Sequence, residues 1–296
     1  MSAAQKEQFD ESFLKKLEYL YIMSKKVVAG SMRADRKTRM VGSGIEFADH
    51  RHYSPGDDFR NLDWRIYGRT EKLFLRMFEE EEDLYIYFLI DSSRSMQIGN
   101  PNKWDYAKRV AAALGYIGLC NLDRVSIIPF SSKLEGRMAP TRGRNQVFKI
   151  FEFLNRADPG DQTCMGDAFK KFVSQNKRSG LAVVISDFYD PEGFEAGLNF
   201  LRYHRFEPIV VQLFDERELG VNFHGELQLV DCETGQVNDI IVTDAILRQY
   251  VKAFEDFSQE LEDYCKKRQM LYFRAPLQVP FDELILKIFR AGGFIK

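Results

Sequence analysis

The chain has 296 residues, of which 45% are hydrophobic and 29% are charged, and its net charge at pH 7 is −2. These values are ordinary for a globular protein with a full core, and the near-neutral charge gives no electrostatic reason to expect nucleic acid or an anionic membrane as a partner. The length allows one large domain with an appendage, or two small domains.

The cysteines and the apolar runs bear on where the protein resides. The cysteines form no Cys-x-x-Cys pair, which favours reduced thiols over a disulfide framework or a zinc site. Residues 1–10 are polar and acidic, unlike a signal peptide. No apolar run approaches the roughly 20 residues that span a bilayer. We therefore expect a soluble, cytoplasmic protein with no integral membrane segment.

The first 83 residues are predicted to form an N-terminal extension. Phe13, Leu17 and Leu20 recur at helical spacing within residues 9–29, and a basic loop follows over residues 31–40. Residues 42–69 lack a simple period, and their alternating Arg and Asp or Glu predict a loop network held by salt bridges. We assign residues 1–83 to this extension and residues 84–296 to the main domain.

From residue 84 onward, predicted strands and helices alternate, which indicates an α/β fold. We expect a doubly wound, mostly parallel central sheet with helices on both faces. Pro129 places its strand near an edge of that sheet. The predicted strands are 84–90, 125–130, 132–138, 181–186, 208–214, 226–231, 237–242 and 270–274, and the predicted helices are 104–119, 146–154, 166–172, 193–203, 244–267 and 281–290.

One stretch, residues 84–96 (LYIYFLIDSSRSM), carries the most informative pattern. Its apolar run suits a strand buried on both faces, and at the carboxyl end of such a strand side chains face the crevice where α/β sheets bind ligands. Asp91, Ser93 and Ser95 offer three hard oxygen donors there, which suit Mg²⁺ better than zinc. Alternatively, these residues only cap the next helix. On this stretch alone, both interpretations stand.

A second apolar strand, residues 181–186, also ends in a carboxylate, Asp187. If both strands lie centrally in one parallel sheet, Asp91 and Asp187 emerge on the same rim. Thr163 precedes a predicted helix, and its hydroxyl could join them. Two carboxylates and three hydroxyls, completed by water, suit an octahedral Mg²⁺ with ligands at about 2.0–2.1 Å.

The motif Asp91-x-Ser93-x-Ser95, followed by Thr163 and Asp187 in that order, resembles the metal-ion-dependent adhesion site of von Willebrand factor A domains. The resemblance implies a von Willebrand A-like, Rossmann-like fold. It also implies that these five residues hold Mg²⁺ or Mn²⁺, some directly and some through water, and that an acidic residue of a partner can complete the shell. Arg94 departs from the commonest motif, where a small residue is frequent. Its guanidinium could weaken ion binding or contact an acidic ligand.

A narrower resemblance rests on the segment that precedes this strand. It reads Glu46-Phe47 and then Arg51-x-Tyr53-x-Pro55-Gly56-Asp57-Asp58-x-Arg60-x-x-Asp63-Trp64. Together with the adhesion-site motif, it is similar to the bacterial family called domain of unknown function fifty-eight, over roughly residues 40–290. The resemblance implies association with MoxR-type AAA+ ATPases. Many relatives carry N-terminal transmembrane helices, and membrane attachment does not carry over to this chain. The Arg51–Trp64 segment is either a second interaction surface or a structural brace, and we favour the brace because Tyr53, Phe59 and Trp64 could pack against the sheet domain.

Three functions are compatible with these residues. We expect a non-enzymatic, divalent-metal-dependent protein-interaction module, an adaptor or cofactor of a MoxR-type AAA+ ATPase, which binds that ATPase or its client. The first alternative is a von Willebrand A-like scaffold with a vestigial ion site. The second is a metal-dependent hydrolase, in which the ion activates water. Against the hydrolase, the motifs contain no obvious general base, and the chain has no GxSxG elbow, P-loop or HExxH.

Overall fold

The computed structural model describes residues 9–31, 38–40, 46–80, 84–160, 164–220 and 225–292. The chain divides into two compact units, one made of Met1–Val27 with Leu84–Ile295 and the other of Val28–Asp83. We expected a domain boundary after residue 83, and the long second segment of the larger unit does begin at Leu84. The expected 1–83 extension, however, is shared between the two units, because its first helix clusters with the sheet.

The larger unit is built on a six-stranded sheet in the order β11-β8-β7-β4-β5-β6. Neighbouring strands are parallel except for β5 and β6, which pair antiparallel. The expected mostly parallel α/β sheet is thereby confirmed. The strands are β4 (Tyr85–Asp91), β5 (Arg124–Phe130), β6 (Met138–Thr141), β7 (Leu181–Ser186), β8 (Glu207–Phe214) and β11 (Leu271–Pro276).

The central strands owe their position to continuous apolar sequence. All six residues of β7 are buried, and so are the last six of β4. A strand buried on both faces must be apolar throughout, because helices cover both sides of a parallel sheet. Pro129 lies in β5, next to the edge strand β6, near an edge as expected.

The expected strand at 132–138 is corrected to β6, which begins only at Met138. The chain first turns after β5, where Ser131 N donates to Lys133 O (2.8 Å) and Glu135 N donates to Pro129 O (2.9 Å). The turn leaves only an isolated antiparallel bridge between Phe130 and Leu134 before the strand pairing with β5 begins at Met138.

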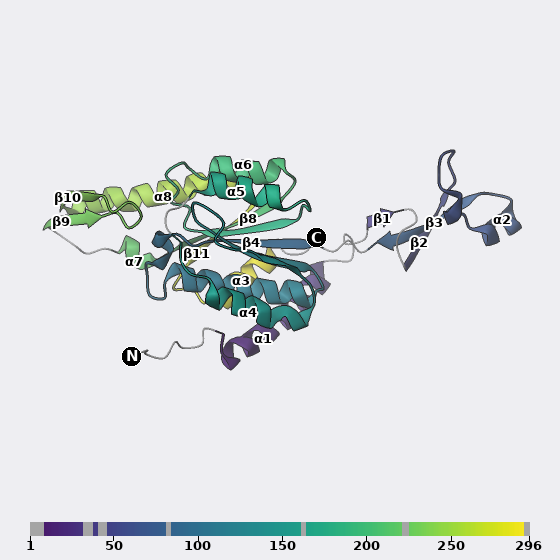
Figure 1. The fold of residues 1–296 in the computed structure, drawn as a ribbon, viewed down its shortest axis with the longest axis horizontal. Coiled ribbons are helices and arrows are strands. Elements are labelled where there is room, and N and C mark those ends of the chain that lie inside the picture. Colours follow the sequence, from purple (N-terminus) through teal and green to yellow (C-terminus); the bar gives the residue numbers. More distant parts are fainter. Residues whose placement is uncertain are drawn as a thin grey trace. The chain divides into compact units, whose positions relative to one another are not determined.

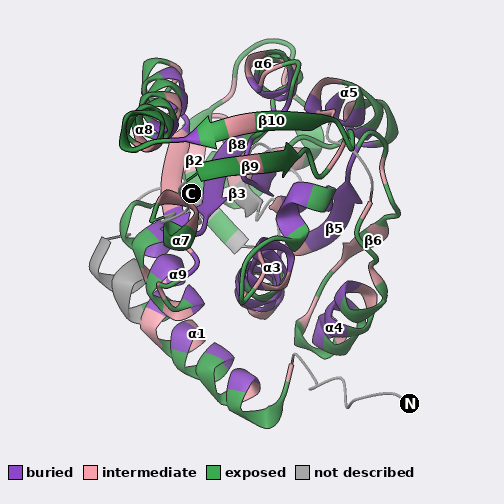
Figure 2. Cartoon of the chain, turned by 90° about the vertical axis from the view of Figure 1, so that its left-hand side faces the viewer, coloured by how far each residue is buried: buried purple, intermediate pink, exposed green. Residues whose placement is uncertain are grey.

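Helices cover both faces of the sheet (Figures 1 and 2). Helices α3, α4 and α9 lie on one face, and α5, α6 and α8 lie on the other, as the sequence predicted. The helices of this unit are α1 (Glu11–Ser31), α3 (Lys103–Cys120), α4 (Val147–Arg156), α5 (Met165–Gln175), α6 (Glu195–Tyr203), α7 (Glu216–Leu219), α8 (Asp244–Lys267) and α9 (Phe281–Arg290).

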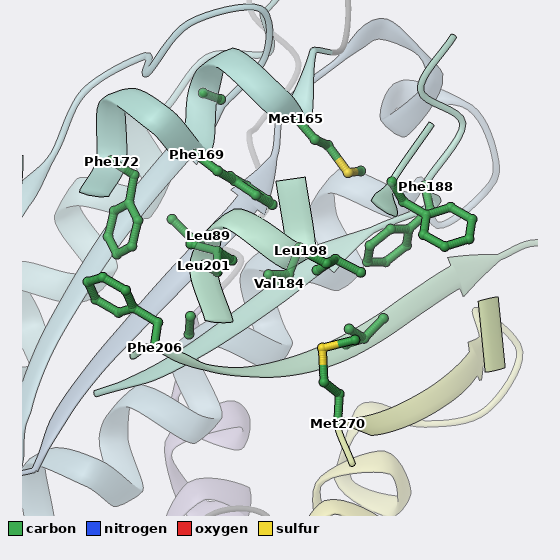
Figure 3. Close-up of a cluster of buried hydrophobic side chains, with 14 of the residues drawn as sticks. Leu89, Met165, Phe169, Phe172, Val184, Phe188, Leu198, Leu201, Phe206 and Met270 are labelled. Atoms are coloured by element: carbon green, nitrogen blue, oxygen red, sulfur yellow. The ribbon is translucent and has the colours of Figure 1, made fainter. Parts of the chain in front are cut away.

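A cluster of buried hydrophobic side chains lies between the sheet and helices α5, α6 and α8 (Figure 3). Phe169 of α5 is fully buried, and its ring meets that of Phe130 edge-on at 5.2 Å between centroids. Phe172 makes a similar contact with Tyr87 of β4 at 5.2 Å. Burial of such aromatic side chains supplies much of the stability of a core, and here it fixes the strands whose ends form the site described below.

Helix α1 packs on the same side as α4 and α9. The ring of Phe13 lies 5.2 Å from that of Phe281 in α9 and 6.0 Å from that of Phe151 in α4. An ion pair between Glu18 and Arg144 (2.7 Å) adds an exposed contact. These contacts explain why the first helix belongs to the sheet unit. Among the described residues, no helix is long and apolar enough to cross a membrane.

A two-stranded antiparallel hairpin, β9 (Gly225–Val230) and β10 (Val237–Val242), projects from the sheet unit (Figure 2). Its strands are paired from Gly225↔Val242 to Val230↔Val237, as the predicted hairpin required. Thr243 then caps α8 by accepting a hydrogen bond from Ile246 N, which confirms one of the two expected caps.

The smaller unit is a three-stranded sheet in the order β1-β3-β2, with two short helical segments in the connection between β2 and β3. The basic segment that was expected as a loop contributes β1, and residues 32–37 of it lie outside the described residues. The elements are β1 (Thr38–Met40), β2 (Glu46–His52), a 3-10 turn (Phe59–Asn61), α2 (Trp64–Thr70) and β3 (Phe74–Glu80).

The polar residues of this unit pair locally. Arg51 contacts Asp57 at 2.7 Å, and His50 contacts Asp63 at 3.0 Å, which agrees with the expected network of salt bridges. Tyr53 stacks on Phe59 at 5.4 Å. Phe59 and Trp64 are each 62% exposed, so neither ring is buried within the smaller unit.

Candidate metal centre

The candidate site lies where the strand order of the sheet reverses. From β4 the chain moves to β5 and β6 on one side, and it then returns to β7, β8 and β11 on the other. In open α/β sheets, ligands bind at the carboxyl ends of the strands on either side of such a reversal. Asp91 is the last residue of β4, and Asp187 directly follows β7. The prediction that these two aspartates share one rim is confirmed.

Asp91 is fully buried and is held by two hydrogen bonds. Its Oδ1 accepts from Ser93 N (2.9 Å) and its Oδ2 accepts from Ser186 Oγ (2.6 Å). The same Ser186 Oγ accepts from Phe188 N at 2.8 Å. The end of β7 thus orients a carboxylate that belongs to β4, which is how a rigid scaffold positions a polar group.

The two motif serines converge. Ser93 is fully buried and Ser95 is 8% exposed, and their hydroxyl oxygens lie 3.0 Å apart. Neighbouring ligands of an octahedral Mg²⁺, each about 2.0–2.1 Å from the ion, stand about 2.9 Å from one another. The separation of the hydroxyls, and the hard oxygen chemistry of the carboxylates beside them, therefore fit such an ion.

The alternative that these residues only cap the next helix is wrong. Helix α3 begins at Lys103, and its cap is Asn102, whose side chain accepts from Asp105 N at 2.7 Å. Ser93 does precede a short 3-10 turn, but its side chain makes no capping hydrogen bond there. The two buried hydroxyls instead hydrogen-bond each other at 3.0 Å.

Asp187 has a partner that the sequence did not reveal. Lys103 is 2% exposed, and its Nζ lies 3.1 Å from Asp187 Oδ2 and 3.0 Å from Glu218 Oε1. The ammonium also lies 5.5 Å from the centre of the Tyr189 ring. A buried lysine is retained in a folded protein only when it is paired, and here two carboxylates from different elements pair with it.

The surrounding loops fix Lys103 in place. It is the first residue of α3, and the turn before it is held by Arg217, which donates to Asn100 O. Arg217 in turn pairs with Asp215, the N-cap of α7, at 2.9 Å. Glu218 is part of that same short helix. The lysine and its second partner are therefore positioned by one connected network.

Burial and charge shift the pKa values of these groups. Burial, and then the negative charge of Asp187, raise the pKa of Asp91 to about 7, although the hydrogen bonds from Ser186 and Ser93 oppose the rise. Burial alone would lower the pKa of Lys103, but the attraction of Asp187 and Glu218 outweighs it and raises that pKa. The rim therefore combines a carboxyl group that resists ionisation with an ammonium that resists neutralisation.

Thr163, the remaining predicted ligand, lies outside the described residues. The described residues on either side of it are tied to the rim. Gly160 N donates to Ser92 O at 2.5 Å, and Cys164 N donates to Ser131 O at 3.4 Å. Four of the five predicted ligands, Asp91, Ser93, Ser95 and Asp187, are thus placed at one edge of the sheet.

Three polar residues at this rim escaped the sequence-based prediction. Ser186 carried a usable signal, because a hydroxyl at the end of an apolar strand adjoins the second aspartate. Lys103 and Glu218 carried none, since both lie in polar stretches that resemble exposed surface. Arg94, which we expected near the ion, is exposed, and the buried positive charge at the rim comes from Lys103 instead.

The described residues contain no group of three or more His, Cys, Asp or Glu side chains that could hold a metal ion. The candidate centre is of another kind, because two of its four described donors are serine hydroxyls. Such a donor set suits a hard cation like Mg²⁺ or Mn²⁺ and does not suit zinc.

Two solved structures show a weak similarity to this chain. The conserved hypothetical protein BatB from Bacteroides thetaiotaomicron is 15% identical with a TM-score of 0.46, covering 71% of this chain and 98% of that one. The pilus adhesin SpaC from Lactobacillus rhamnosus GG is 12% identical with a TM-score of 0.42, covering 71% of this chain and 30% of that one. At these TM-scores, neither similarity assigns the fold.

The relatives by sequence have no assigned activity. The uncharacterized protein Rv1480 of Mycobacterium tuberculosis is 25% identical over 242 residues, which cover 80% of this chain and 76% of the relative. An uncharacterized protein of Mycobacterium bovis matches to the same extent. The family model described as protein of unknown function DUF58 matches residues 49–260, which include parts of both units and all four described ligand candidates. This chain therefore belongs to the DUF58 family.

Proposed function

We propose that this chain is a non-enzymatic, divalent-metal-dependent protein-interaction module with a von Willebrand A-like sheet domain. The observation that carries the proposal is the buried convergence of Asp91, Ser93 and Ser95 beside Asp187 at the reversal of strand order. Asp91, Ser93, Ser95, Thr163 and Asp187 would hold Mg²⁺ or Mn²⁺.

A bound divalent ion would supply a positive charge with a coordination position open to an external anion. The chain provides only two carboxylates among these ligands, so the ion would keep affinity for a further carboxylate. An Asp or Glu of another protein is the group that we expect there. The role of the sheet is to hold the donors rigid at its rim.

The partner that we propose is a MoxR-type AAA+ ATPase or one of its clients, met in the cytoplasm. This part of the proposal is supported by the resemblance of the Glu46–Trp64 pattern and of the adhesion-site motif, which occur in one chain in the order of that family. Membership of the DUF58 family is consistent with it.

A von Willebrand A-like scaffold with a vestigial ion site is the second candidate. It is favoured by Lys103, whose ammonium already pairs with Asp187. An ion pair of this kind can replace a metal ion as the counter-charge of a buried carboxylate. The two candidates differ in whether a divalent ion binds at all.

Calorimetric titration with Mg²⁺ and Mn²⁺ tests the ion site. We expect binding to the wild-type chain and none to Asp91→Asn, because the amide removes the negative charge while keeping the shape of the side chain. The matched control is Asp123→Asn, a buried aspartate that precedes β5 at the opposite end of the strand. Equal affinity in the Asp91 and Asp123 variants would remove the site assignment.

A retention experiment tests the partner. The purified chain is immobilised and incubated with native lysate in Mg²⁺ or in EDTA, and bound AAA+ ATPase is identified by mass spectrometry. We expect the ATPase to be retained in Mg²⁺ and lost with EDTA or Asp91→Asn. Retention that ignores the chelator would favour the scaffold, and turnover of phosphate or ester substrates that is lost in Asp187→Ala would favour the hydrolase.

A further inference from the structure

The buried lysine at the rim has no part in the proposed set of metal ligands. Lys103 Nζ lies within 3.1 Å of Asp187 Oδ2, and Asp187 is one of the two carboxylates that would hold the ion. Both side chains are almost fully buried, at 2% and 1% exposure. A cation that is covalently part of the chain thus stands beside an atom that a metal ion would need.

Two positive charges this close to one carboxylate oppose each other. The repulsion is strong at the rim because buried charges are screened much less than exposed ones. A divalent ion at Asp187 therefore either binds weakly or displaces the ammonium.

Glu218 is a second carboxylate partner for the ammonium of Lys103. Its Oε1 lies 3.0 Å from Lys103 Nζ, and its side chain is 20% exposed. It is carried by α7, whose N-cap Asp215 accepts hydrogen bonds from Arg217 N (2.9 Å) and Gln278 Nε2 (2.6 Å). This carboxylate is anchored independently of Asp187, so it can keep the lysine paired when Asp187 is taken by an ion.

We propose that Lys103 is a built-in competitor of the divalent ion for Asp187, and that Glu218 receives the ammonium when the ion binds. This inference rests on the proposed metal-dependent function. Its consequence is that the isolated chain binds the ion weakly, because each binding event must separate Lys103 from Asp187. The lysine thereby sets the ion concentration that is needed to occupy the site, and a carboxylate of the partner that binds the ion would lower that concentration.

The test is calorimetric titration of Mg²⁺ into wild-type protein and into Lys103→Gln. The glutamine amide can still donate a hydrogen bond to a carboxylate but has no charge, so the variant removes the competing cation. We expect the affinity for Mg²⁺ to rise about tenfold or more, as removal of a closely placed like charge requires. Lys103→Arg keeps the charge and is expected not to gain affinity.

The matched control is Lys108→Gln. Lys108 belongs to the same helix and is 8% exposed, but it pairs with Asp105 at 2.9 Å and lies over the Trp104 ring. Removal of its charge is expected to change the affinity by less than about twofold, since exposed or differently paired charges interact weakly over distance. An equal gain in the two glutamine variants would show a general charge effect and overturn the inference.

A second pair of variants keeps the inference testable if Lys103→Gln does not fold. Glu218→Gln removes the receiving carboxylate, and Glu216→Gln removes an exposed one from the same four-residue helix. We expect Glu218→Gln to weaken Mg²⁺ binding clearly more than Glu216→Gln, because the ammonium then has only Asp187. Equal effects of the two variants would overturn the inference.

The failures of the two proposals are distinguishable. Wild-type binding that is unchanged or weaker in Lys103→Gln overturns the competition while leaving the metal-dependent function in place. Absence of Mg²⁺ binding in the wild type and in every variant overturns both. Tighter binding in Lys103→Gln that disappears again when Asp91→Asn is added supports both.

Discussion

The rim of the central sheet and the Arg51–Trp64 segment of the smaller unit are both rich in aspartate, yet they hold their carboxylates in opposite ways. At the rim, Asp91 and Asp187 are at most 1% exposed. In the segment, Asp57 and Asp63 keep contact with solvent and pair with Arg51 and His50.

This difference in surroundings appears in the pKa values. Burial raises the pKa of Asp91 to about 7. The hydrogen bond from His50, with those from backbone N–H groups, lowers the pKa of Asp63. Perturbed carboxyl groups in which burial dominates are typical of functional sites, whereas those lowered by local hydrogen bonds are typical of turns and caps. Two conspicuous motifs in one chain therefore hold their aspartates differently: the rim buries them, and the segment pairs them with nearby basic side chains.

The largest expected change in stability comes from a substitution in the hydrophobic core that supports the rim. Phe169→Ala removes a fully buried ring, and we expect it to lower the free energy of unfolding by about 3–5 kcal/mol. The chain has two tryptophans, of which Trp104 is buried in the sheet unit. Urea unfolding followed by Trp104 fluorescence in a Trp64→Phe background therefore reports on the sheet unit alone.

The control for this measurement is Phe148→Ala. Phe148 is on α4 and is 66% exposed, so its truncation is expected to change the stability by no more than about 0.5 kcal/mol. Similar losses in both variants would mean that the cluster in Figure 3 does not carry the stability of the sheet.

The next effect concerns pH and separates the two kinds of aspartate. Because the pKa of Asp91 is raised in the folded chain, the folded state binds more protons than the unfolded state between about pH 4 and pH 7. Stability without divalent ions is then expected to fall as the pH rises through that window. In EDTA, the unfolding free energy of wild type should drop from pH 5 to pH 8 relative to that of Asp91→Asn.

Asp63 gives the opposite sign in a different window. Its folded pKa is lowered, so the stability that it contributes is present above its ordinary pKa and is lost as the pH falls through the folded pKa. Carboxyl carbon chemical shifts measured by NMR report both groups in one titration. If the pKa of Asp91 were found to be lower than that of Asp63, the comparison between the two regions would be reversed.

Much of the sheet could be predicted because its determinants are local. An apolar run such as Leu181–Ser186 has no other stable place than a buried strand, and a carboxylate after it must emerge at a rim. Asp91 and Asp187 were brought together by that reasoning alone. The helices followed from their period, and the structure places them on both faces of the sheet as expected.

The rest of the rim depended on contacts between distant residues. Lys103 and Asp187 are 84 positions apart, and a lysine at the start of a helix is usually exposed. Nothing in its neighbours distinguishes it from Lys108 or from a surface residue. Likewise, α1 joined the sheet unit through Phe13 and its contacts with Phe151 and Phe281, which sequence spacing cannot specify.

The smallest expected effect decides what the Arg51–Trp64 segment does. Trp64 is 62% exposed and contacts Tyr67 edge-on at 6.1 Å. We expect Trp64→Ala to change the stability of either unit by no more than about 0.5 kcal/mol, as is usual for exposed positions. Far-ultraviolet circular dichroism during urea unfolding, together with Trp104 fluorescence, measures this change.

The same variant distinguishes a brace from an interaction surface. An indole that braced the fold by burial would cost about 3–5 kcal/mol when truncated, so a loss of that size would restore the expectation of a brace. An unchanged stability with weaker retention of the AAA+ ATPase would instead make the exposed aromatic rings of Phe59 and Trp64 part of the contact with the partner. Asp91 belongs to the other unit, so the double variant Asp91→Asn/Trp64→Ala measures whether the two losses of retention add, as those of independent sites do.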